Sequence, residues 1–295
     1  MKLSITVPMA MFALSLGGSD AWAAQGTVAG HAQATACVSL LNAADSASGA
    51  SAHPSTCSPA RELSVTQDNC TMAVVGRGVW MDVLRPLVPD SYGLTTTTAA
   101  PGRPPGPYSS IFILDQYCQD VVVHGRRSAP STTTYVITRV TTVDGQPATT
   151  TFYTLYIGTD NPQLFALYRS AGLPVDFLPA NSTTITQVGG ATQAVFAIQG
   201  GEFDHEFTVL ENPPVAPYTF DTGATWLYDA PRGRLSLVWD NDLSPNAPAI
   251  ISGSVEADTT LAELVPEFLH TINNVRFPTA YRTGSHIQTL TRCPQ

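Results

Sequence analysis

The chain has 295 residues, of which 43% are hydrophobic and 13% are charged, and its formal net charge is −9 at pH 7. This composition predicts a globular protein with one hydrophobic core. The acidic balance argues against nucleic acid and anionic membranes as partners, because a basic patch is needed to displace their counterions. The only lysine is Lys2, so the rest of the chain has no side-chain amine for Schiff-base chemistry.

The first 23 residues are organised like a signal peptide. Lys2 is followed by an apolar run over residues 3–16, and Ala21-Trp22-Ala23 is a small-x-small cleavage motif. We therefore expect residues 1–23 to be removed and the protein to be secreted, either extracellular or periplasmic. No later stretch reaches the roughly 18 apolar residues that a membrane-spanning helix needs, so no membrane span is expected.

Residues 24–65 are rich in Ala, Ser and Gly, which predicts a flexible N-terminal arm, and residues 66–295 are expected to form a single β-rich domain. An exported location favours disulfides. The chain after the leader contains five cysteines: Cys37, Cys57, Cys70, Cys118 and Cys293. We predict two disulfides of open connectivity, with the fifth cysteine either free or paired with another chain. None of the spacings is Cys-x-x-Cys, so no metal site is expected.

From residue 72 onward the dominant signal is short runs of β-branched and aromatic residues separated by Gly, Pro and Asn. These runs cover residues 111–114, 119–124, 133–142, 183–188, 193–199 and 202–210. Turn residues at 143–146 and 228–233 predict hairpins between adjacent strands. The fold class we expect is mainly β (α+β), an antiparallel β-barrel or two packed sheets with two or three short helices. One of these helices should begin near residue 260 and be kinked by Pro266.

The clearest local signal covers residues 150–179. A strand with apolar side chains on both faces is expected to be buried in the centre of a sheet. Asn161 can cap the following helix, Pro162 suits its first position, and Gly172 ends it. The pattern predicts a helix over residues 162–171 whose apolar stripe packs on the sheet.

An apolar strand, then Asp160-Asn161, a short helix and Gly172-Leu173-Pro174 together resemble the acetoacetate decarboxylase superfamily. The segment 85–90 and Arg77 extend the resemblance, which covers about residues 74–255 and implies a barrel with an interior site. In that family the Gly-x-Pro turn is followed by two lysines, one of which forms the Schiff base. Val175 and Asp176 stand there in this chain. The resemblance therefore implies that this chain is not a Schiff-base decarboxylase.

Three other motifs invite a functional interpretation. His205 lies between Asp204 and Glu206, but strand alternation sends the histidine to one face and the acids to the other. We expect a half-buried histidine flanked by solvated acids, with an inward-facing pocket histidine as the alternative. Gly78-Val79-Trp80 also occurs in lipocalins, although a core tryptophan is the simpler interpretation. Asp240-Asn241-Asp242 lacks the ligand spacing of a calcium loop and is interpreted as a turn.

Three classes of function remain. We favour a secreted, non-catalytic protein that binds a small organic molecule. The alternatives are a secreted lyase or hydrolase that uses residues other than lysine, and a secreted structural or interaction protein. The predicted ligand-binding residues are Arg77, Val175 and Asp176, and no cofactor is expected. Arg77 would pair with a carboxylate or carbonyl of the ligand, and Asp176 would orient Arg77 or accept a hydrogen bond.

Overall fold

The structure is a computed structural model that describes residues 63–96, 98, 104–143, 146–211, 225–231, 233–243, 247–266, 272–275 and 279–293. The predicted signal peptide (1–23) and almost all of the predicted arm (24–65) lie outside the described residues, so both stay predictions. No helix in the described part of the chain is long and apolar enough to cross a bilayer.

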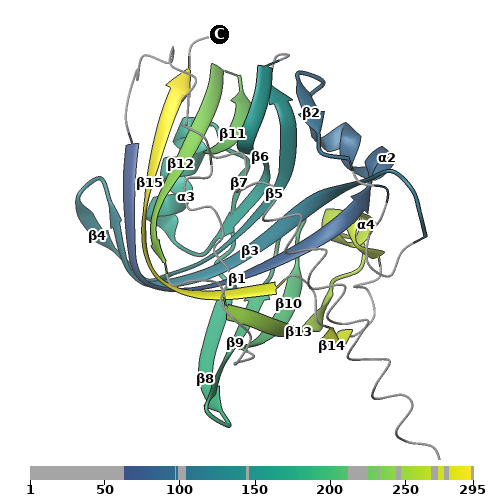
Figure 1. The fold of residues 1–295 in the computed structure, drawn as a ribbon. Coiled ribbons are helices and arrows are strands. Elements are labelled where there is room, and N and C mark those ends of the chain that lie inside the picture. Colours follow the sequence, from purple (N-terminus) through teal and green to yellow (C-terminus); the bar gives the residue numbers. More distant parts are fainter. Residues whose placement is uncertain are drawn as a thin grey trace, which may run out of the picture.

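Seven long strands form a closed barrel (Figure 1). They are hydrogen-bonded in the order β1-β3-β5-β6-β11-β12-β15, and β15 pairs back onto β1. Their bounds are β1 Leu63–Trp80, β3 Tyr108–Val123, β5 Ser131–Val143, β6 Gln146–Thr159, β11 Thr225–Ala230, β12 Gly233–Leu243 and β15 Thr279–Cys293. All of these neighbours are antiparallel except β6 and β11. Closure pairs the backbone groups that an open sheet would expose at its edges.

A second sheet covers one side of the barrel. Its strands are β8 Ser182–Val188, β9 Ala191–Ile198, β10 His205–Glu211, β13 Ala247–Val255 and β14 Ile272–Val275. One buried apolar cluster joins this sheet to the outer faces of β1, β3, β5 and β6. The remaining elements are α2 Met81–Leu84, the 3₁₀ helix η1 Arg85–Leu87, β2 Tyr92–Leu94, β4 Arg126–Ser128, α3 Pro162–Ala171, β7 Val175–Phe177 and α4 Thr260–Leu264. The expected fold class, a β-barrel with packed sheets and a few short helices, is confirmed.

The β6-α3 unit forms as the sequence predicts. β6 is paired on both sides and is buried on both faces. α3 covers Pro162–Ala171, and the Asn161 Oδ1 accepts hydrogen bonds from the backbone N–H groups of Gln163 and Leu164. Gly172 ends the helix in the left-handed region at φ 91°, where a side chain would be strained.

Several sequence predictions need correction. The runs 111–114 and 119–124 are one continuous strand, β3, because β1 pairs with it along its whole length. Asp240-Asn241-Asp242 is not a turn but the end of β12, where it is paired with β15. α4 ends at Leu264, so Pro266 follows the helix instead of kinking it. The β6-β11 and β6-β7 pairings are parallel, although only antiparallel pairs were expected.

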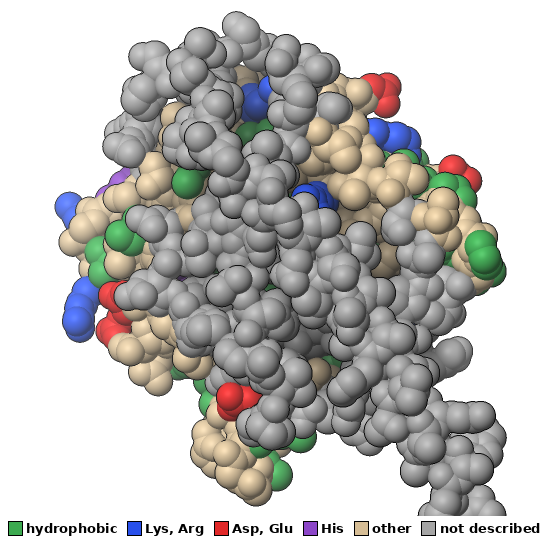
Figure 2. All heavy atoms as spheres, viewed as in Figure 1, with side chains coloured by type: hydrophobic (Ala, Val, Ile, Leu, Met, Phe, Trp, Pro, Cys, Tyr) green, Lys and Arg blue, Asp and Glu red, His purple; other side chains and the backbone are tan. Residues whose placement is uncertain are grey.

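The described surface carries its charge in a dispersed form. On the face shown in Figure 2, the described arginine side chains (blue) lie apart from one another, and some have acidic side chains (red) close by. The exposed ion pairs, such as Arg127 with Asp120 at 4.0 Å, contribute little stability because water screens them. The stability of the fold must therefore come mainly from its buried contacts.

The cap of α3 provides a test of how the helix is held. Asn161 is buried, and its amide nitrogen also donates to Ser128 Oγ at 2.9 Å and to the Ala129 carbonyl at 2.7 Å. Asn161→Ala should lower the free energy of unfolding by about 2 kcal/mol, because the cap is lost and its buried partners are left unpaired. Urea denaturation measures this change. The exposed neighbour Gln163→Ala is the matched control and should change the midpoint little. Equal midpoints for both variants would contradict this account of the helix start.

Candidate functional site

The barrel interior can be identified from the packing. One buried cluster draws on all seven barrel strands and on α3. Along each strand its members share one face, as Leu235, Leu237 and Trp239 do on β12. The one face that all strands of a closed barrel share is the inside, so this cluster lies inside the barrel. α3 contributes Leu164 and Tyr168 to it.

Six polar side chains lie within this interior, each no more than 1% exposed: Gln67, Gln116, Tyr135, Tyr168, His286 and Gln288. The Gln288 amide is their hub. Its Nε2 donates to Tyr135 Oη and to Gln67 Oε1, each at 3.0 Å, and its Oε1 accepts from the Tyr168 hydroxyl. His286 Nε2 lies 2.8 Å from Gln67 Oε1. These contacts connect β1, β5, β15 and α3 through the centre of the barrel.

These polar groups carry no charge near neutral pH. Burial lowers the pKa of His286 to about 3, so its imidazole is neutral. The ring stacks on Trp239 with centroids 4.5 Å apart. Burial raises the pKa of Tyr135 to about 12 and raises that of Tyr168 as well. The interior is therefore polar but uncharged.

Besides Thr154 Oγ1 on β6, four buried polar atoms of this interior have no hydrogen-bond partner. They are Gln67 Nε2, Gln116 Oε1, Trp226 Nε1 and Trp239 Nε1. Leaving a polar atom buried and unpaired costs about 1–3 kcal/mol, and folded proteins pair nearly all such atoms with protein, water or ligand. The set consists of three donors and one acceptor, so the barrel centre can bind oxygen atoms of a small molecule or of ordered water.

The three predicted ligand-binding residues do not lie in this polar centre. Arg77 is 8% exposed on the face of β1 that also carries Val75 and Val79, which belong to the outer cluster. Val175 packs against the interior cluster. Asp176 is exposed. Burial, followed by the nearby Asp176 carboxylate, raises the pKa of the Tyr156 hydroxyl.

The strand register separates Arg77 from Asp176. Successive strand pairings from β1 through β3 and β5 to β6 lead from Arg77 to Tyr153, which is three strands away. Asp176 lies on β7, one strand beyond β6, and pairs with a different residue of β6, Gly158. Strands lie about 4.8 Å apart and rise about 3.3 Å per residue, so the two positions are roughly 25 Å apart along the sheet. Their joint role in ligand binding stays a prediction, and the backbone does not place them side by side.

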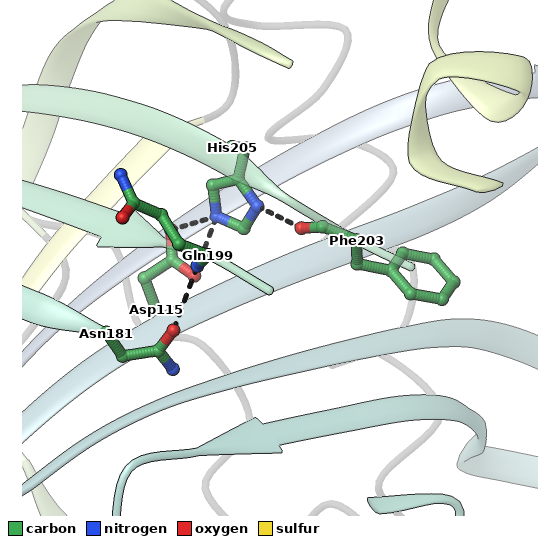
Figure 3. Close-up of polar contacts among 5 residues, drawn as sticks. All are labelled: Asp115, Asn181, Gln199, Phe203 and His205. Atoms are coloured by element: carbon green, nitrogen blue, oxygen red, sulfur yellow. Dashed lines mark hydrogen bonds and ion pairs between the residues drawn. The ribbon is translucent and has the colours of Figure 1, made fainter. Parts of the chain in front are cut away.

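His205 forms a second polar site, between the barrel and the second sheet (Figure 3). Its Nε2 lies 2.9 Å from Asp115 Oδ2, and its Nδ1 lies 2.7 Å from the Phe203 carbonyl oxygen. Both partners are acceptors, so both ring nitrogens must carry a proton. Burial lowers the pKa of His205, but the charge and hydrogen bonds of Asp115 outweigh that effect and raise it overall. His205 and Asp115 are thus a buried imidazolium–carboxylate pair.

The sequence prediction for His205 is partly wrong. The ring is 2% exposed instead of half-buried, because this face of β10 lies against the barrel. Its flanking acids do face away, as predicted: Glu206 is exposed, and Asp204 accepts from the N–H groups of Gly200 and Gly201. Asp115 was missed. No sequence signal links two residues 90 positions apart on different strands.

A third polar cluster joins β2 to the β11–β12 hairpin. The Tyr92 hydroxyl donates to Asp229 Oδ1 at 2.5 Å, and Arg234 Nε donates to the same atom at 3.1 Å. The Arg234 guanidinium also lies over the Tyr92 ring, 5.0 Å from its centroid. Asp229 thus has two donors of its own, which is the arrangement of a structural tie.

One disulfide, Cys70–Cys118, joins β1 to β3 inside the barrel. The second predicted disulfide would join two of the three other cysteines, Cys37, Cys57 and Cys293. The structure does not describe their side chains, so this disulfide stays a prediction. Trp80, predicted as a core residue, is only partly buried and packs on Tyr108 with ring centroids 4.3 Å apart.

Removing one partner of the His205–Asp115 pair should destabilise the protein strongly. Asp115→Ala is expected to lower the free energy of unfolding by about 3–5 kcal/mol, because a buried charge is left without its partner. The double variant Asp115→Leu/His205→Leu should recover most of this loss. Glu206→Gln, exposed on the same strand, is the matched control for chemical denaturation. A loss of under about 1 kcal/mol in Asp115→Ala would rule out a charged pair.

The same pair predicts a pH dependence. Because the folded-state pKa of His205 is raised above its unfolded value of about 6.5, its contribution is complete below that pH and is lost as pH rises through the folded pKa. The unfolding free energy of wild type, measured relative to that of the double leucine variant, should therefore decrease as the pH rises above 6.5. His286 changes stability with pH in the opposite sense, because burial lowers its pKa. Wild type and the variant both contain His286, so its contribution cancels in the comparison. A difference that is flat from pH 6 to about 9 would contradict the assignment of charge.

Comparisons with known proteins agree with this architecture. No family model and no curated protein sequence matches the chain. Among solved structures, acetoacetate decarboxylase from Legionella pneumophila subsp. pneumophila str. Philadelphia 1 superposes with a TM-score of 0.50 at 11% identity, over 78% of this chain and 86% of that one.

Two further structures superpose less well. An acetoacetate decarboxylase-like enzyme from Sphingomonas wittichii RW1 has a TM-score of 0.47 at 9% identity, over 79% of this chain and 92% of that one. The enduracididine biosynthesis enzyme MppR, complexed with pyruvate, has a TM-score of 0.44 at 13% identity, over 81% and 91%. At such low identity only the fold is shared. The closed barrel, the β6-α3-β7 unit and the Legionella superposition together show that this chain has an acetoacetate decarboxylase-like fold.

Proposed function

We propose that this chain is an exported, non-catalytic protein that binds a small, neutral, oxygen-bearing organic molecule inside the barrel. The observation that carries the proposal is the set of four unpaired polar atoms on Gln67, Gln116, Trp226 and Trp239. Three of them are donors, which suit carbonyl, ether or hydroxyl oxygens of a ligand. Binding sites for small molecules typically combine an apolar lining with a few placed polar groups of this kind.

The aromatic residues favour a ligand with a flat or apolar portion. Trp226 and Trp239 lie with ring centroids 4.3 Å apart, and Tyr135 packs edge-on against both at 5.2 Å. The indole N–H groups and the aromatic faces thus belong to one neighbourhood. A molecule with a carbonyl and a short apolar body fits this mixture of donors and aromatic surface.

The titration behaviour of the interior supports binding over catalysis. A general acid or base works best with a pKa near the operating pH. His286 has a pKa of about 3 and Tyr135 one of about 12, so each stays in one protonation state under ordinary conditions. The positions of the family's lysines hold Val175 and Asp176, which cannot form a Schiff base.

A neutral ligand is favoured over an organic acid. A carboxylate in the barrel centre would need a buried positive partner, and none of the six polar side chains of the centre carries a charge near neutral pH. Arg139 shares the inner face of β5, where it pairs with Phe152, but its side chain is only partly buried. Arg77 lies on the outer face of β1. Export rests on the N-terminal sequence pattern, residues 1–23.

A ligand screen tests the proposal. Oxidised protein would be screened by thermal shift against neutral ketones, esters, lactones and amides, with organic acids as a second set. A ligand at 100 times its Kd should stabilise the fold by about 2.7 kcal/mol. Trp226→Phe removes one unpaired N–H donor but keeps an aromatic ring, and it should weaken a hit by about 5- to 10-fold, which is the value of one hydrogen bond.

Two controls identify the place of binding. Ser236→Ala alters the outer face of β12, between the interior residues Leu235 and Leu237, and should leave affinity unchanged. Arg77→Ala tests the site predicted from the sequence. Hits that depend on Arg77 and not on Trp226 would move the site to the outer cluster. If no compound in either set stabilises the wild type, the unpaired atoms are satisfied by water and the proposal fails.

A further inference from the structure

The fold brings three potential metal ligands together inside the barrel. Cys118, Cys70 and His286 lie on the adjacent strands β3, β1 and β15, and all three are buried. One ligand atom from each lies within 4.8 Å of the other two. His286 Nδ1 is 3.9 Å from Cys70 Sγ. In the structure described above, the two sulfurs are joined as a disulfide.

We propose that the reduced protein binds one Zn²⁺ ion through Cys70, Cys118 and His286. A dithiol or phosphine reductant supplies two electrons, the S–S bond breaks and two thiols form. Zn²⁺ then displaces the two thiol protons, and both cysteines bind as thiolates. The disulfide and the metal use the same sulfur atoms, so each state excludes the other.

The geometry suits a tetrahedral site. With Zn–S near 2.3 Å and Zn–N near 2.0–2.1 Å, the ligand atoms of such a site lie about 3.6–3.8 Å apart. The existing separation of 3.9 Å between His286 Nδ1 and Cys70 Sγ is close to this value. Cys70 and Cys118 are directly opposite each other on antiparallel strands. Side chains in this position start from neighbouring Cβ atoms, so the freed sulfurs can separate by rotation about their Cα–Cβ bonds.

The charge balance also favours zinc at this place. Two thiolates neutralise the two positive charges of Zn²⁺, so the occupied site adds no net charge to an uncharged interior. An unbalanced ion would be costly there.

Gln116 provides a candidate for the fourth ligand. Its Nε2 lies 2.6 Å from Cys118 Sγ and 3.8 Å from Cys70 Sγ, and its Oε1 has no hydrogen-bond partner. Rotation of the amide by half a turn brings Oε1 to the place of Nε2, next to both sulfurs. Oxygen is an accepted zinc ligand, and a bound water is the alternative for this position.

Cysteine spacing alone gave no sign of this site. The two cysteines are 48 residues apart, and His286 is 216 residues from Cys70, whereas sequence motifs for zinc rely on cysteines a few residues apart. The expectation of no metal rested on that spacing. Here the pairing of β1 with β3 and β15, and not a short spacing in the sequence, brings the three ligands together.

Cobalt binding provides the first test. Protein reduced with a phosphine would be titrated with Co²⁺, which should bind once per chain and show thiolate-to-metal charge transfer that Zn²⁺ abolishes. The oxidised protein should show neither signal. Cys118→Ser and His286→Gln should each weaken binding by at least about 100-fold, because a direct ligand is lost. The triple variant Cys37→Ser/Cys57→Ser/Cys293→Ser should retain the site.

The second test covers loss of folding on reduction. If the reduced protein unfolds without metal, one equivalent of Zn²⁺ should restore the circular dichroism of the fold, because metal binding is then coupled to folding. Folded reduced protein that binds no Co²⁺, unfolded protein that Zn²⁺ does not refold, or unchanged binding in Cys118→Ser would each overturn the proposal. Ligand binding by the oxidised protein is a separate measurement, so either result can fail without the other.

Discussion

The pairing of β15 with β1 is the constraint on which the rest of the structure depends. It joins the last strand of the chain to the first described strand and turns an open sheet into a barrel. Once the ring is closed, each strand has an inner and an outer face, and side chains two residues apart along one strand share an environment. Gln67 of β1, Gln116 of β3 and Gln288 of β15 then meet at the centre, although they come from distant parts of the chain.

The inner and outer faces solve the problem of burying polar groups in different ways. The outer face buries one full charge pair, Asp115 with His205, and both ring nitrogens of the histidine find an acceptor. The inner face buries only neutral groups and leaves several of their atoms unpaired. A satisfied pair is what a structural tie between two sheets requires. A site for a neutral molecule requires neutral side chains with polar atoms that still lack hydrogen-bond partners. The inner face has such atoms, which is why we propose that the ligand binds inside the barrel.

The proposed zinc site follows from the same interior. The histidine ligand is neutral, and the two thiolates balance the two positive charges of Zn²⁺. The barrel can therefore hold either a disulfide or the metal without burying net charge. Under the oxidising conditions that the proposed export implies, the disulfide is the expected state. The barrel centre therefore combines two proposed properties, binding of a neutral organic molecule and a redox-dependent choice between a disulfide and zinc.

The sequence by itself determined the features that depend on neighbouring residues. Asn161, Pro162 and Gly172 define α3 because capping, the first helical turn and the left-handed end are local matters of backbone geometry. Alternation along β10 correctly sent Glu206 away from His205, and the order of β6, α3 and the Gly172-Leu173-Pro174 turn correctly indicated the fold. The sequence alone also shows that Val175 and Asp176 stand where the resembled family has its lysines.

Only the tertiary structure decided which distant residues meet. The partner of His205 is Asp115 on another strand, and the neighbours of Cys70 are Cys118 and His286. Arg77 and Asp176 were expected to share a site, yet the register places them four strands apart. The physical reason is that a strand pattern specifies which face a side chain occupies, whereas strand order and register, which local sequence does not encode, specify what lies opposite.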